Sequence, residues 1–125
     1  MVDSINPVHW FEISVNDMDR ARKFYERVLG LQLGLNRVES TLMAWFPTTE
    51  GGAGCSGGLL KSEGRTPSHD GTMIYFSVAD IEAVLARVET NGGRTLTPKT
   101  DIGEYGFYAY FEASEGNRVG LHSSA

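Results

Sequence analysis

The amino-acid sequence predicts an α+β fold in which a βαβββ unit occurs twice. Two observations lead to this prediction. In each half of the chain, a strand-like alternation of apolar and polar residues is followed by a helical pattern and then by further strand-like segments. The same marker residues also recur: aligning residues 14–17 with residues 77–80 keeps a serine, a valine and an aspartate in register, and Gly30 then coincides with Gly93. The matching order of elements indicates an internal duplication.

The first module covers about residues 6–63. Alternation over residues 8–15 predicts a strand with one face on a core. Asp17 is expected to begin a helix, because its carboxylate can accept hydrogen bonds from the free amides of the first turn. Gly30 is expected to end that helix. The remaining strands of this module are expected at residues 31–38, 41–46 and 57–62.

The second module, about residues 71–124, repeats this order after a linker of about residues 64–70, which is marked by the breakers Gly64 and Pro67 and followed by Gly71. A strand is expected over residues 73–78, and Asp80 is expected to cap a helix that ends at residues 91–93. The remaining strands are expected at residues 94–97, 106–112 and 118–123. The 125 residues therefore form a single domain built from two half-domains.

Composition excludes several classes of protein. Hydrophobic residues make up 41% and charged residues 22%, which is typical of a globular domain. The net charge is −5 and no Lys/Arg cluster is present, so we expect neither nucleic acid nor a membrane as partner. There is no secretory signal or spanning apolar run, and the single Cys55 cannot form an internal disulfide. These features favour a cytoplasmic protein in which Cys55 has no catalytic role.

Two motifs resemble the vicinal oxygen chelate superfamily, which includes glyoxalases, extradiol dioxygenases and bleomycin-resistance proteins. Residues 15–25, Val-Asn-Asp-Met-Asp-Arg-Ala-Arg-Lys-Phe-Tyr, resemble the start of the family's first helix. Residues 115–122, Glu-Gly-Asn-Arg-Val-Gly-Leu-His, resemble its closing turn and last strand. The resemblance implies that the modules form a curved mixed sheet around a cleft, with the helices outside and a metal in the cleft. It also implies a possible homodimer.

The resemblance places the family's metal ligands at positions that this chain fills differently. Those ligands are typically His, Gln or Glu, one from each of four strands. Here Trp10, Met73 and Gly120 stand at three of the four positions, and none of them is a ligand for a hard divalent cation. We therefore expect no metal and no cofactor. The alternative is a divalent metal held by atypical ligands, namely Glu12 and His122, with His9 as a third candidate.

Glu12 and His122 are also the candidate catalytic residues. Alternation places Glu12 on the cleft face with Trp10, and His122 on the cleft face with Gly120. The two side chains could act as an acid and a base. A structural hydrogen bond that lines a polar pocket explains the same residues without catalysis.

The candidate substrate-binding residues are large, and most carry a polar group: Trp10, Met73, Tyr75, Tyr108 and Tyr110. Apolar walls with a few polar groups are typical of small-molecule pockets. Tyr108 and Tyr110 share one face of their strand, and Phe107 and Phe111 lie on the other. Either pair could line the cleft, and the hydroxyl groups favour the tyrosines.

Three other features have simpler interpretations. His9 falls on the helix-facing side unless its strand slips by one residue, and His69 is expected to be a solvated linker residue. Residues 52–57 match the pattern G-x-G-x-x-G, but a phosphate-binding loop needs a strand directly before it and a helix after it. This segment has neither, so we expect a loop at the mouth of the cleft that could act as a lid.

The sequence thus predicts a glyoxalase/bleomycin-resistance-like protein that binds a small organic molecule in the cleft between its modules, without the family's usual metal. One alternative is a divalent-metal-dependent lyase, isomerase or dioxygenase of the glyoxalase type. Another is a protein whose main role is assembly and whose cleft is vestigial. Sequence alone does not decide whether the protein is an enzyme.

Overall fold

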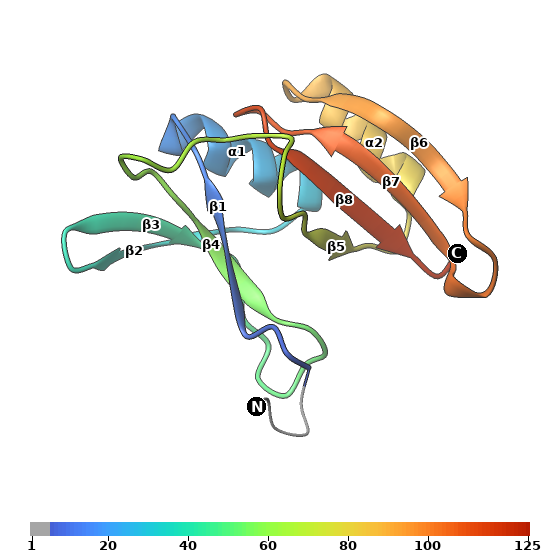
Figure 1. Ribbon diagram of the computed structural model, residues 1–125, viewed down its shortest axis with the longest axis horizontal. Helices are drawn as coiled ribbons and strands as arrows, with labels where there is room; N and C mark the ends of the chain where they lie inside the picture. Colours follow the sequence, from blue (N-terminus) through green and yellow to red (C-terminus); the bar gives the residue numbers. More distant parts are fainter. Residues whose placement is uncertain (1–5) are drawn as a thin grey trace.

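The computed structural model describes residues 6–125, which form two four-stranded sheets and two α-helices (Figure 1). Module one contains β1 (Trp10–Ser14), α1 (Met18–Leu29), β2 (Gly34–Val38), β3 (Thr41–Trp45) and β4 (Ser56–Leu60). Module two contains β5 (Tyr75–Ser77), α2 (Ile81–Thr90), β6 (Arg94–Asp101), a 3-10 helix (Gly103–Tyr105), β7 (Phe107–Glu112) and β8 (Arg118–Ser123). The predicted α+β class and the tandem βαβββ order are confirmed.

The two sheets share one topology. Their strand orders are β1-β4-β3-β2 and β5-β8-β7-β6, and in each sheet the first strand of the module runs parallel to its last strand. The remaining pairs are antiparallel. The register therefore places equivalent residues opposite one another: Glu12, Gly58 and Trp45 in module one, and Tyr75, Gly120 and Tyr110 in module two.

Both helices begin at the aspartates that the sequence indicates. Asp17 accepts a hydrogen bond from the Arg20 amide at 3.0 Å, and Asp80 accepts one from the Ala83 amide at 3.1 Å. Gly30 ends α1 in the left-handed conformation, with φ 69°, which a glycine adopts without steric cost. The equivalent end of α2 is Asn91.

A single hydrophobic core joins the modules. Helix α1 packs against β4 and against α2, while α2 covers β6, β7 and β8. In the view of Figure 1, α2 lies behind β6 and β7, and α1 lies between β1 and β8. Aromatic rings cross the junction: Phe76 of module two lies 5.4 Å from Phe46 and 5.9 Å from Phe11 of module one, measured between ring centroids. Because Phe11 and Ile13 both face this core, β1 has the register that the alternation predicts.

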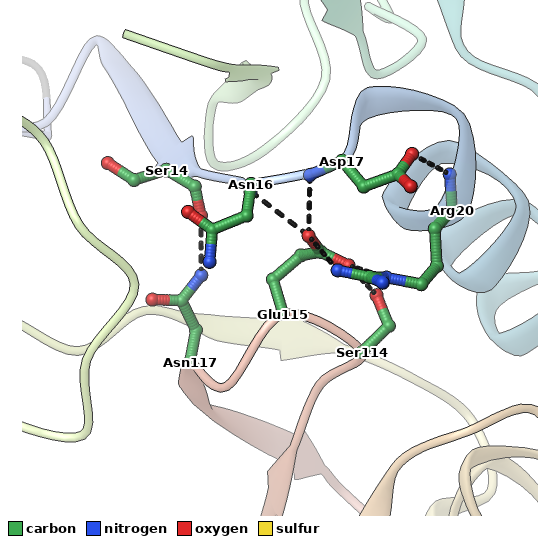
Figure 2. A network of polar contacts seen from close by, with 7 residues as sticks. All are labelled: Ser14, Asn16, Asp17, Arg20, Ser114, Glu115 and Asn117. Carbon is green, nitrogen blue, oxygen red and sulfur yellow. Dashed lines mark hydrogen bonds and ion pairs between the residues drawn. The ribbon is translucent and has the colours of Figure 1, made fainter. Parts of the chain in front are cut away.

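A buried carboxylate fastens the closing turn of module two to the start of α1 (Figure 2). Glu115 accepts hydrogen bonds from the backbone amides of Asn16 and Asp17 at 3.0 and 2.8 Å, and from the Arg20 guanidinium at 2.7 and 3.0 Å. Only 1% of its side chain is exposed. The Asn117 side-chain amide donates to the carbonyl of Ser14 at 2.8 Å. We call these contacts the Glu115 clasp.

Several element boundaries differ from the sequence-based expectations. Strand β5 begins at Tyr75, so Met73 lies before it instead of inside it. Strand β6 continues past Pro98 to Asp101, where the sequence predicts an end at residue 97. Proline is tolerated there because β6 is the outer strand of its sheet and its pairing with β7 contains register shifts. Within residues 6–125, no helix is long and apolar enough to cross a membrane.

Candidate functional site

A pocket of about 500 Å³ opens where the two modules meet. It lies between the start of β1, the loop that joins β3 to β4, and the segment around β5. Met73 and Tyr75, two of the predicted binding residues, line it together with three aromatic residues that the sequence analysis assigned only to strands: Phe11, Phe46 and Phe76. The volume and the largely apolar lining are typical of sites for small organic molecules.

The open face of module one, which points away from the helices, carries an aromatic and acidic group. The Trp10 indole N–H donates to Glu12 Oε2 at 3.3 Å, and the rings of Trp10 and Trp45 meet edge to face with centroids 5.6 Å apart. Arg65, from the linker, forms an ion pair with Glu12 at 2.9 Å. The linker therefore reaches this face, and its Arg65 binds the carboxylate of Glu12, which the sequence analysis names as a candidate catalytic residue.

The open face of module two is built from tyrosines. The hydroxyls of Tyr75 and Tyr110 are 3.0 Å apart, and the Tyr108 and Tyr110 rings have centroids 5.1 Å apart. The hydrogen bond to Tyr110, together with partial burial, raises the pKa of Tyr75 above its ordinary value. Phe111 is fully buried in the core, so the Tyr108/Tyr110 face is the one that points outward.

Gly120 lies beneath the ring of Tyr75. A Cβ atom at this position would come within 2.6 Å of Tyr75 Cε2, which is closer than side chains tolerate. The space that a longer side chain at residue 120 would need is therefore filled by the tyrosine ring. In module one, Gly58 has a similar place: its Cβ would lie 2.9 Å from Cδ1 of Trp45.

The residues at the family's ligand positions do not fit a divalent metal. Trp10 and Met73 offer no hard donor atom, and the space at Gly120 is taken by a phenol ring. Among residues 6–125, no cluster of three or more His, Cys, Asp or Glu side chains is arranged to hold a metal ion.

Among the hydrogen bonds and ion pairs of residues 6–125, none joins Glu12 to His122. His122 Nε2 lies 2.6 Å from the carbonyl oxygen of Tyr105, which can only accept, so Nε2 carries the proton and donates. Glu12 lies in the other sheet and is bound to Arg65 and Trp10. Their proposed roles as acid and base stay a prediction.

The other two histidines lie apart from these groups. His9 is exposed just before β1 and lines a second pocket, of about 570 Å³, formed with the loop of residues 47–56. His69 is not a free linker residue, because its Nε2 lies 2.6 Å from Glu112 Oε2 on β7. Arg94 binds the same carboxylate, and hydrogen bonds from Arg94 and His69 outweigh burial and hold the pKa of Glu112 below its usual value.

The glycine-rich segment of residues 52–57 joins β3 to β4 and leads into a strand. The structure thus lacks the helix that a phosphate-binding loop requires at this point. Exposed Cys55 lies in this loop. The loop forms a wall of both pockets, and its role as a lid stays a prediction.

Sequence reasoning missed Arg118 as a site residue. Period-two alternation on the last strand places it on the face of Gly120 and His122, so the signal was available. The three phenylalanines of the pocket could not be recognised in the same way, because from sequence they are indistinguishable from ordinary core residues.

Comparison with known proteins agrees with this architecture. The model of the Glyoxalase/Bleomycin resistance protein/Dioxygenase superfamily matches residues 7–121. A curated relative from Mycobacterium bovis, named "Putative glyoxylase CFP32", is 26% identical over 117 residues. The match covers 90% of this chain and 44% of the relative, so the chain spans less than half the length of that protein.

Two solved structures share the fold. The glyoxylase/bleomycin resistance protein/dioxygenase domain from Frankia sp. EAN1pec has a TM-score of 0.73 at 18% identity, covering 98% of this chain and all (100%) of that one. TnmS3, an antibiotic binding protein from Streptomyces sp. CB03234, has a TM-score of 0.66 at 21% identity, covering 99% of this chain and 100% of its own.

Proposed function

The chain belongs to the Glyoxalase/Bleomycin resistance protein/Dioxygenase superfamily, and from this premise we propose that it binds a small organic molecule in the pocket between its modules, without a metal. The observation that carries the proposal is the pocket of about 500 Å³ at the junction, which Phe11, Phe46, Phe76 and Tyr75 line. Such a lining suits a ligand with an apolar, aromatic body.

Two further observations support this proposal. The Tyr75 ring fills the space above Gly120, where the family resemblance would place a glutamate ligand. The fold is also shared with TnmS3, which is described as an antibiotic binding protein, so the same scaffold serves at least one protein that binds a small molecule.

The experiment fills the pocket with a large side chain placed on the loop that lines it. We expect Ala53→Trp, in the loop lining, to abolish binding of the neutral aromatic probe 2-naphthamide, measured by isothermal titration calorimetry. Ala86→Trp, on the exposed side of α2 and outside the pocket, is the matched control and should bind the probe as the unmodified protein does. Equal binding by the Ala53→Trp variant would show that the probe binds elsewhere.

Metal independence is tested separately. We expect the purified protein to contain no stoichiometric Zn, Ni, Mn or Fe by mass spectrometry, and EDTA to leave the affinity for 2-naphthamide unchanged. A stoichiometric metal whose removal weakens binding would contradict the metal-free proposal.

A second candidate function is catalysis of the glyoxalase type, as a lyase, isomerase or dioxygenase. The relative from Mycobacterium bovis, which is named a putative glyoxylase, favours it. In that case Glu12 and His122 are the groups to test, and Glu12→Gln should abolish turnover while leaving ligand binding intact. Glu63→Gln, on an exposed residue of the linker region, is the matched control.

We also propose that a second copy of the chain covers the open face of module one. Trp10 is 37% exposed there and packs against Trp45, an aromatic surface that is unfavourable to leave in water, and the tyrosine face of module two stays free for a ligand. Sedimentation should then give a mass of about twice 13.7 kDa. We expect the protein to act in the cytoplasm, where an exposed thiol such as Cys55 stays reduced.

A further inference from the structure

Arg118 is a cation on the open face of module two for which residues 6–125 supply no carboxylate partner. It lies on β8 directly opposite Glu112 on β7, where a cross-strand ion pair is expected. Glu112 is instead bound by Arg94, with Nε 3.2 Å from Oε1, and by His69, with Nε2 2.6 Å from Oε2. Arg118 takes part in none of the ion pairs found within residues 6–125.

The guanidinium of Arg118 also has an unsatisfied hydrogen-bond donor among the described residues. Its Nε atom is buried and has no hydrogen-bond partner in the part of the chain that the structure describes. A buried N–H without an acceptor is unfavourable, because it has lost its water without replacement. The side chain as a whole is only half-buried, so an acceptor from outside the chain can approach the terminal N–H groups of the same guanidinium, and a small turn of the side chain would bring Nε to it as well.

The neighbours of Arg118 supply further donors and a flat surface. The guanidinium carbon lies 5.7 Å from the centroid of the Tyr110 ring. In the Tyr75–Tyr110 pair, whose oxygens are 3.0 Å apart, one hydroxyl donates to the other, and the accepting hydroxyl keeps its own proton free to donate outward. Tyr108 extends the aromatic surface, with its ring centroid 5.1 Å from that of Tyr110.

Two carboxylates line the pocket of about 200 Å³ that contains Arg118. Glu12 is held by Arg65 at 2.9 Å. Asp70 lies on the exposed linker and belongs to none of the ion pairs found in residues 6–125. Asp70 is thus the one residue in this pocket whose charge would oppose an incoming anion.

We propose that Arg118, Tyr75 and Tyr110 form a binding site for the carboxylate of a small planar aromatic acid. The planar guanidinium can bind both oxygens of a carboxylate, the free tyrosine hydroxyl can donate to one of them, and the aromatic body can stack on the tyrosine rings. Tyr75 also lines the pocket between the modules, so the inference rests on the proposed function and specifies the class of its ligand.

The test compares two probes of the same shape, 2-naphthoate and the neutral 2-naphthamide. We expect the unmodified protein to bind the carboxylate at least tenfold more tightly by calorimetry. Arg118→Met, which keeps the apolar stem, should remove this preference and leave the affinity for 2-naphthamide unchanged. Arg118→Lys should retain part of the preference, and Asp70→Asn should increase it.

Arg27→Met, on the exposed side of α1, is the matched control for loss of one positive charge and should keep the full preference. A second measurement needs no substitution: the Arg118 Nε–H signal in NMR spectra should shift on addition of 2-naphthoate and not with 2-naphthamide. Equal affinities for both probes, a preference that survives in Arg118→Met, or an unchanged Nε–H signal would overturn the site. In those cases binding of 2-naphthamide would leave the proposed function standing, whereas binding of neither probe would overturn both.

Discussion

In module one, the open face carries the carboxylate of Glu12 beside Gly58, which lies under the ring of Trp45. In module two, the equivalent position to Glu12 is Tyr75, and its own ring covers the equivalent glycine, Gly120. The strand order and register are the same. One face, however, is acidic and tied to the linker by Arg65, and the other is phenolic and carries Arg118, which forms no ion pair with the described residues. The duplication thus preserves the backbone, and the chemistry differs between the halves because different side chains fill equivalent positions.

The Glu115 clasp is a second difference between the modules. It holds the start of α1 through two backbone amides and Arg20. The corresponding start of α2 has its own Asp80 cap and no such carboxylate among the hydrogen bonds of residues 6–125. Module one therefore depends on a residue of module two for the start of its helix.

The largest effect is expected from removing the clasp. Glu115→Ala leaves the amides of Asn16 and Asp17 and the Arg20 guanidinium without their acceptor, so it should lower the free energy of unfolding by about 3 kcal/mol. Urea denaturation measures this change. Glu82→Gln, an exposed acid in the first turn of α2, should change stability by less than about 0.5 kcal/mol. Similar losses in both variants would mean that the clasp does not distinguish the modules.

Glu115 should also make the free energy of unfolding depend on pH. Burial would raise the pKa of the Glu115 carboxyl, but the hydrogen bonds from Arg20 and from the amides of Asp17 and Asn16 outweigh it and hold that pKa below its usual value. Its contribution is therefore complete above the unfolded pKa of about 4.3 and is lost as the pH falls through the lowered folded pKa. The difference in stability between the unmodified protein and Glu115→Ala should shrink below about pH 4. A difference that stays constant from pH 7 to pH 3 would contradict this assignment.

Replacing Gly58 or Gly120 by alanine should lower the free energy of unfolding by different amounts. Gly58→Ala brings a Cβ against Trp45, whose indole nitrogen is buried, so we expect a loss of about 2 kcal/mol. In Gly120→Ala the nearest obstacle is the ring of Tyr75, which is half exposed and can turn away, so we expect a loss of about 1 kcal/mol. Thermal or urea unfolding measures both. In a Tyr75→Ala background the substitution of Gly120 should cost almost nothing, and an undiminished cost would show that the ring is not the obstacle.

The smallest effect concerns the tyrosine pair. Tyr110→Phe removes the hydroxyl that hydrogen-bonds Tyr75, so the raised pKa of Tyr75 should fall toward the ordinary value of about 10. Titration followed by NMR of the tyrosine ring carbons measures it. Tyr105→Phe, on a 72% exposed residue, should leave the pKa of Tyr75 unchanged. No change in Tyr110→Phe would show that the hydroxyl pair has no influence on the titration.

Local patterns predict most of the fold. Asp17, Asp80 and Gly30 mark helix ends because capping depends on a side chain or backbone conformation within a few residues. The alternation of Phe11 and Ile13 fixes the inner face of β1 for the same reason. The continuation of β6 through Pro98 was not predictable, because it depends on the strand lying at the edge of its sheet.

The candidate site is less predictable than the fold. Tyr75, Tyr108 and Tyr110 could be placed on the open face by alternation, but their hydrogen bond and their relation to Gly120 come from pairing between strands far apart in sequence. Arg118 forms no ion pair within residues 6–125 because Glu112 binds Arg94 and His69 instead, and the contact with His69 depends on how the linker packs.

The Glu115 clasp also bears on the order in which the protein can be made. Asn16 and Glu115 are 99 positions apart, so the start of α1 leaves the ribosome long before the residue that fastens it. Until then Asp17 caps the start of α1 without help from Glu115, and module one's half of the shared core stays uncovered. Folding during synthesis should therefore finish late, in one step, when the closing turn emerges.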